Sequence, residues 1–175
     1  RPEQPAATRL RREARSFTGI AIAMALVCFA GFAPSYYLKA QFSTPALKPM
    51  IHFHGLVFTG WMVLMVVQTS LISAAKVQLH RRLGIAGAVL VVLMVASGAA
   101  VIWGRATTVT PGMPHEMILS FMAIPTVALA MFPILIGAAL LLRRDAGAHK
   151  RLMVLATTVF LPAAVHRLLM FLIAP

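Results

Sequence analysis

Acidic side chains are almost absent from this sequence, which has four Asp and Glu residues against sixteen Lys and Arg residues. The acids are Glu3, Glu13, Glu116 and Asp145, and none of them lies deep within an apolar run. Proton-coupled membrane transporters usually rely on carboxylates inside the membrane, so this class is disfavoured. Cysteine is equally scarce. Because Cys28 stands alone, the sequence excludes an internal disulfide framework and a cysteine-ligated metal site.

The sequence also lacks the short motifs of the common nucleotide-binding and hydrolytic enzymes. It has no P-loop, no GxSxG motif and no Gly-rich nucleotide loop. No lysine lies inside an apolar run, where it could form a retinal Schiff base. Hydrophobic residues dominate instead: they make up 60% of the 175 residues, and only 11% are charged. That composition lies far outside the range of soluble domains.

Apolar runs of roughly 20 residues, the length of a helix that crosses a bilayer, recur along the chain. We expect five spans, at about 17–38, 51–74, 84–103, 116–142 and 152–173. The fold class predicted is therefore an all-α integral membrane protein. Spans two to five form a four-helix bundle, the N-terminal span is added to it, and a basic segment at 1–16 precedes the whole.

Basic residues gather on one side of these spans. Twelve of the sixteen precede span one or lie in the loops after spans two and four: Arg1, Arg9, Arg11, Arg12, Arg15, Lys76, Arg81, Arg82, Arg143, Arg144, Lys150 and Arg151. Short loops rich in Lys and Arg stay in the cytoplasm, and their surface faces anionic headgroups. We expect a bacterial inner (plasma) membrane protein with a cytoplasmic N-terminus and a periplasmic C-terminus. Its partner is the lipid bilayer rather than nucleic acid.

Two halves of the chain share a weak pattern. Pro49 begins one helical hairpin that turns at HRRL (80–83), and Pro114 begins another that turns at HKRL (149–152). A histidine also follows each proline closely. Such a pattern is typical of two parallel repeats related by an axis along the membrane normal. The alternative is that basic loops simply recur on the cytoplasmic side.

Histidines are the main polar feature of the spans. By depth, His52, His54, His115 and His166 form an outer group, and His80 and His149 form an inner pair. An ionisable residue inside a span is a functional hypothesis by default. Among the outer group, His54 and His166 are the hardest to assign to helix capping or headgroup contact. For His80 and His149, helix capping or headgroup contact is favoured over ligation.

A haem hypothesis follows, because neutral imidazole is a standard axial ligand of haem iron. We expect haem b between His54 and either His166 or His115, with Arg167 beside an anionic group such as a propionate. The inner pair, His80 and His149, would repeat the arrangement. Two haems stacked in this way would carry electrons across the membrane, with a quinone or another redox partner.

Two other functions stay open. A metal-dependent membrane enzyme would bind iron, copper or zinc through His54, His115 and His166, since imidazoles suit these ions. A non-catalytic accessory or assembly subunit of a larger membrane complex, or a homo-oligomer, would instead use small residues for close helix packing, such as Gly84 and Gly98 of span three.

Two stretches carry a resemblance: HGLVFTGWMVLMVVQTSLISAAKVQLHRRLGIAGAVLVVLMVASG and AHKRLMVLATTVFL. They resemble a broad group of small, poorly characterised bacterial integral membrane proteins with His-Gly near the start of a span and His-Arg-Arg-Leu-Gly and His-Lys-Arg-Leu-Met at the turns. The resemblance covers roughly residues 50–160. More loosely, the layout is similar to b-type cytochromes and haem-copper oxidase assembly membrane proteins. That similarity implies His54, His80, His115 and His149 as the haem positions.

Overall fold

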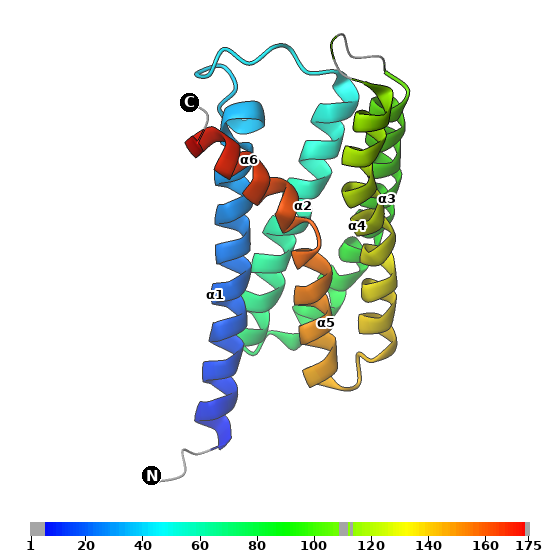
Figure 1. Cartoon of the computed structure of the whole chain (residues 1–175). Helices are drawn as coiled ribbons and strands as arrows, with labels where there is room; N and C mark the ends of the chain where they lie inside the picture. Colours follow the sequence, from blue (N-terminus) through cyan, green and yellow to red (C-terminus); the bar gives the residue numbers. More distant parts are fainter. Residues whose placement is uncertain (1–5, 109–111, 113, 174–175) are drawn as a thin grey trace.

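The fold is a bundle of helices, given by a computed structural model that describes residues 6–108, 112 and 114–173 (Figure 1). Its elements are α1 (Ala6–Phe32), the π-helix η1 (Ala33–Tyr37), α2 (Pro49–Ser73), α3 (Val77–Ala106), α4 (His115–Leu141), α5 (Ala146–Thr158) and α6 (Leu161–Ile173). Over these residues there is no strand, so the all-α prediction is confirmed. Residues 1–5 of the predicted basic segment, and residues 109–111 and 113 between the predicted spans three and four, lie outside the described residues.

Four segments are long and apolar enough to cross a membrane: Arg12–Tyr37, α2, α3 and α4. The pair α5 and α6 counts as a fifth span if its two helices are taken together, although they meet at a bend of 41°. Pro162 explains this break, because a proline within the first turn of α6 has no N–H for the preceding helical turn and its ring clashes with the carbonyl four residues earlier.

The N-terminal helix begins earlier than the apolar run. α1 starts at Ala6 and runs through most of the basic segment before it enters the apolar sequence. At its other end the helix widens into η1, where Pro34 supplies no N–H and the Leu38 amide donates to the Ala33 carbonyl at 2.8 Å. The bundle is closed by α1, which packs against α2 on one side and α6 on the other.

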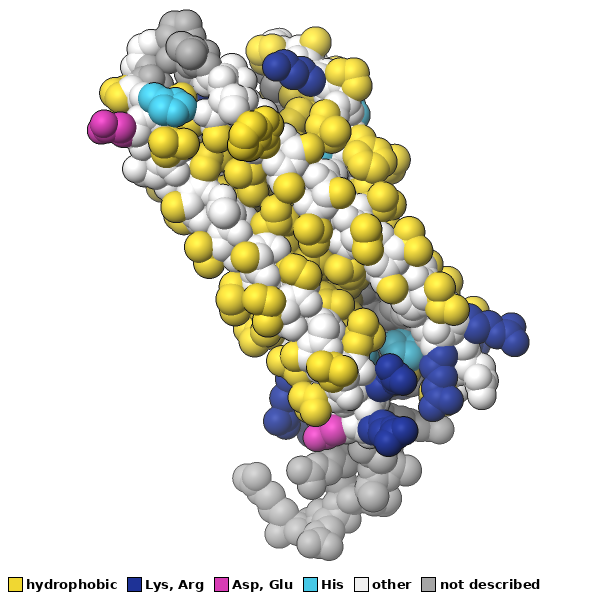
Figure 2. All heavy atoms as spheres, turned by 90° about the vertical axis from the view of Figure 1, so that its right-hand side faces the viewer, with side chains coloured by type: hydrophobic (Ala, Val, Ile, Leu, Met, Phe, Trp, Pro, Cys, Tyr) yellow, Lys and Arg dark blue, Asp and Glu magenta, His cyan; other side chains and the backbone are white. Residues whose placement is uncertain are grey.

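The interior is filled by apolar side chains from four helices. Its centre is formed by Val57, Trp61, Met65, Met94, Phe132, Ile136 and Ala156. One buried hydrogen bond crosses it, from Trp61 Nε1 to Thr157 Oγ1 at 3.2 Å. The outer face is also apolar: Leu141 is 85% exposed and Ile85 is 71% exposed. Figure 2 shows hydrophobic side chains along the whole flank and most of the visible Lys and Arg gathered at one end. Such a surface fits a lipid bilayer.

We call this end the basic end. It is made by the start of α1 and by the turns α2–α3 and α4–α5, which lie together at the bottom of Figure 1. Its described basic residues are Arg12, Arg15, Lys76, Arg81, Arg82, Arg143, Arg144, Lys150 and Arg151.

Candidate functional site

Two histidines face each other at the basic end. His80 is the fourth residue of α3, and His149 is the fourth residue of α5. In each case the backbone N–H donates to the carbonyl of the residue just before the helix, Lys76 at 3.1 Å and Asp145 at 2.9 Å. The ring centroids are 6.4 Å apart and the ring planes are nearly perpendicular, at 84°. The two similar turns of the sequence thus present their histidines in the same helical register.

Neighbouring backbone groups fix the position of His149. Asp145 caps α5, because its Oδ1 accepts from the amides of Gly147 at 2.8 Å and Ala148 at 3.1 Å. The Nδ1 of His149 lies 2.8 Å from the Ala139 carbonyl, which belongs to the last turn of α4. Carbonyls in a last turn have no helical partner of their own. Because a carbonyl only accepts, Nδ1 carries the proton, and in the neutral tautomer Nε2 is the nitrogen with the lone pair.

Polar atoms around His80 have fewer hydrogen-bond partners than those around His149. Gln68 Nε2 donates to the His80 carbonyl at 3.2 Å. The Oε1 of Gln68 and the Nδ1 of His80 are both buried, and neither has a hydrogen-bond partner among the described residues. Native proteins rarely leave buried polar atoms unpaired. Two such atoms beside one histidine pair therefore mark a place where a bound group or a water completes the polar contacts.

Positive charge surrounds the pair. Arg81 follows His80, and Lys150 and Arg151 follow His149. Lys150 is already engaged, because its Nζ pairs with Glu13 of α1 and lies 5.1 Å from the centroid of the Phe17 ring. Arg81 and Arg151 are exposed, so they are available to an anionic group at this end of the bundle.

The outer histidines are arranged differently. The ring of His54 is half-buried and lies 4.2 Å from that of Phe58, and its buried Nδ1 has no partner among the described residues. His115 is the first residue of α4, His166 lies on α6, and both side chains are exposed. His52 is exposed as well, with its ring 5.8 Å from that of Tyr36. Across the described residues, no group of three or more His, Cys, Asp and Glu side chains is placed to hold a metal ion.

Aromatic rings occupy the interior beside His54. Phe58 contacts Phe160 at 5.0 Å, Phe160 contacts Phe132 at 4.9 Å, and Phe132 contacts Trp61 at 5.2 Å, all between centroids. Arg167 packs against α1 and η1, with its guanidinium 5.0 Å from the Phe32 ring centroid and Nη1 donating to Ser35 Oγ at 3.4 Å.

His80 and His149 are the only two of the six histidines whose rings contact each other. They come from different spans. The depth argument favoured His54 and His166, for which the structure records no mutual contact. The signal that pointed to the inner pair was the recurrence of His-basic-Arg-Leu at 80–83 and 149–152. Gln68, which supports His80, was not among the site residues predicted from the sequence. Comparisons of the chain with protein-family models, with curated proteins and with solved structures find no match.

Proposed function

We propose that this chain is a membrane-embedded haem b protein in which His80 and His149 are the two axial ligands of the iron. The observation that carries the proposal is the pair of half-buried rings from α3 and α5, with centroids 6.4 Å apart and planes at 84°. Haem iron takes imidazole ligands on opposite faces of the macrocycle, and each ligand usually has its other ring nitrogen held by a hydrogen bond.

The distance between the two histidine rings can be compared with the distances expected for different metal sites. With a metal–nitrogen bond of about 2.0–2.1 Å, two imidazoles that bind one ion from opposite sides have ring centroids about 6.3 Å apart, and tetrahedral ligation brings the centroids to about 5 Å. The 6.4 Å between His80 and His149 is close to the first of these separations, so the two rings would have room to hold one iron between them.

The donor set fits haem on two further counts. His149 donates its Nδ1 proton to Ala139 and keeps Nε2 for iron, while His80 has a buried ring nitrogen that lacks a partner. Arg81, which follows His80 and is exposed, would meet a propionate, because guanidinium forms bidentate pairs with carboxylate. When bound, haem supplies a one-electron redox couple whose potential depends on its axial ligands and on burial.

The test is the visible spectrum of the protein, expressed with a haem precursor and purified in detergent. We expect about one haem per chain and a Soret band that shifts on reduction. His80→Ala and His149→Ala are each expected to lower the haem content at least tenfold, because one axial ligand is lost. The matched controls are His54→Ala and His166→Ala, which should leave the spectrum unchanged.

A folding control accompanies the spectra. All four variants should elute as monodisperse proteins, which shows that a lost haem signal does not come from a lost fold. A wild-type protein that stays colourless after incubation with haem would rule the proposal out. Loss of the band in the His54 variant, with retention in the His80 variant, would move the site to the outer group.

The proposal also gives the chain an orientation in a bacterial inner membrane. We infer that the basic end lies in the cytoplasm, because short loops with many Lys and Arg residues are retained on that side. The haem site would then lie near the cytoplasmic surface. We expect a reporter enzyme that works only in the periplasm to be active when it is fused after Pro175. Activity of a reporter that works only in the cytoplasm, fused at the same position, would show that the orientation is the opposite one.

A further inference from the structure

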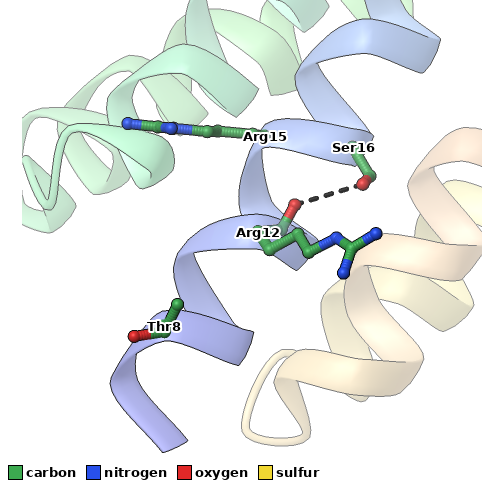
Figure 3. A pocket seen from close by; sticks show the side chains of 4 residues that line it. All are labelled: Thr8, Arg12, Arg15 and Ser16. Carbon is green, nitrogen blue, oxygen red and sulfur yellow. Dashed lines mark hydrogen bonds between the residues drawn. The ribbon is translucent and has the colours of Figure 1, made fainter. Parts of the chain in front are cut away.

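Two adjoining hollows lie along α1 at the basic end, apart from the histidine pair. The first, of about 590 Å³, is lined by Thr8, Arg12, Arg15 and Ser16 (Figure 3). The second, of about 430 Å³, lies between α1 and α2, and Arg15 lines it together with Gly19, Ile22 and Ser73. Both hollows are open to the outside, and Arg15 borders both of them. We refer to them together as the groove, which follows α1 from its charged end toward its apolar part.

The groove has unpaired positive charge at its mouth. Neither Arg12 nor Arg15 forms an ion pair within the described part of the chain. The two guanidiniums extend from α1 in opposite directions (Figure 3), and both residues line the first hollow. A guanidinium prefers planar, bidentate contact with a phosphate or a carboxylate, so the mouth of the groove suits an acidic group.

Three serine hydroxyl groups that line the groove donate to backbone carbonyls. Ser16 donates to the Arg12 carbonyl at 3.1 Å, Ser70 to the Val66 carbonyl at 2.7 Å, and Ser73 to the Thr69 carbonyl at 3.1 Å. These oxygens therefore offer only lone pairs to a ligand. The arginines must be the donors to the acidic group, and the serines can accept from a ligand that carries hydroxyl groups of its own.

The apolar end of the groove is open because a residue without a side chain lies there. A Cβ added to Gly19 would meet no atom within 4 Å, and Ile22 and Ala74 supply apolar walls. The floor is closed by the contact between Thr18 Oγ1 and Ser73 Oγ at 3.0 Å. The groove thus combines a cationic mouth with an apolar channel that opens toward the flank of the bundle.

From this combination we propose that the groove binds one anionic phospholipid with a hydroxylated headgroup, as in phosphatidylglycerol. The phosphate lies beside Arg12 and Arg15, and an acyl chain follows Gly19 and Ile22. Basic pockets between transmembrane helices are a general way of holding anionic headgroups. This site is independent of the haem proposal, since it shares no residue with the histidine pair.

The test uses the full chain in a nonionic detergent and follows its thermal unfolding as lipid is added. Phosphatidylglycerol is expected to raise Tm by about 5 °C near saturation, and phosphatidylcholine with the same acyl chains should raise it far less. The double variant Arg12→Gln/Arg15→Gln should lose this shift. The matched control Arg143→Gln/Arg144→Gln removes the same charge from exposed positions at the same end and should keep it.

A second variant tests the acyl-chain part of the groove. A Cβ at position 19 meets open space, so Gly19→Leu should leave Tm without lipid unchanged or slightly higher and abolish the phosphatidylglycerol shift. Three results would overturn the proposal. Inorganic phosphate that reproduces the shift would mean a simple anion site, equal loss in the Arg143/Arg144 control would mean a diffuse basic surface, and a normal lipid response of Gly19→Leu would mean that no chain enters the groove.

Discussion

Gly31→Ala is expected to lower the stability of the protein by about 1–3 kcal/mol or more, because the added methyl group has nowhere to go. A Cβ at Gly31 would overlap the carbonyl oxygen of Ala164 and would lie 2.9 Å from its Cα. These are backbone atoms of α6, so no side-chain rotation relieves the clash. The two helices would have to separate, and Ala164, which is 0% exposed, would lose its packing. Small residues matter here because lipid offers no hydrophobic drive for helix association.

The control for this change is Gly137→Ala in α4, where a new Cβ would meet no atom within 4 Å. Alanine favours helix over glycine by roughly 0.5–1 kcal/mol, so this variant should be as stable as the parent or slightly more stable. Thermal unfolding in detergent measures both. Hydrogen exchange should locate the effect of Gly31→Ala in α6 and the end of α1. Equal stability of the two alanine variants would show that α1 and α6 do not approach each other so closely.

Much of the fold could be predicted from the length of the apolar runs alone. The predicted spans 51–74 and 116–142 agree with α2 and α4 to within two residues at each end. The beginning of α1 was missed, because hydropathy reports what can lie in lipid and not where a helix starts. Residues 6–16 contain Ala, Arg, Glu and Leu, which favour helix as well outside the membrane as inside it.

The candidate site was harder to predict, and the reason is geometric. Depth along a span indicates the level of a histidine but not the direction in which it points. His166 lies on α6, beyond the 41° bend before Pro162, and the size of such a bend cannot be derived from sequence. Depth did group His80 and His149 as an inner pair. Both are in first helical turns, where capping is the usual role, so ligation was not the favoured interpretation for them.

Phe132→Ala is the second substitution for which we expect a large loss of stability. The size of this loss depends on whether the unfolded state keeps the ring in lipid. Phe132 is 0% exposed and its ring lies between those of Trp61 and Phe160. In a soluble protein this substitution costs about 3–5 kcal/mol, part of which is transfer of the side chain from water. In a bilayer the separated helices keep the ring in lipid, so the transfer part is small. The cavity part remains: on the order of 100 Å³ at about 24 cal/mol per Å³ gives about 2 kcal/mol.

The same helix supplies the matched control. Phe121 lies three turns earlier on α4 and is 56% exposed, so Phe121→Ala opens no cavity and should leave the unfolding free energy unchanged within about 0.5 kcal/mol. Unfolding of both variants in mixed micelles gives the difference directly. A loss of 4 kcal/mol or more for Phe132→Ala would mean that the unfolded reference state exposes the ring to water, and equal losses at both positions would mean that α4 presents another face to the core. A loss near 2 kcal/mol at Phe132 alone would show that close packing, rather than escape from water, holds this bundle together.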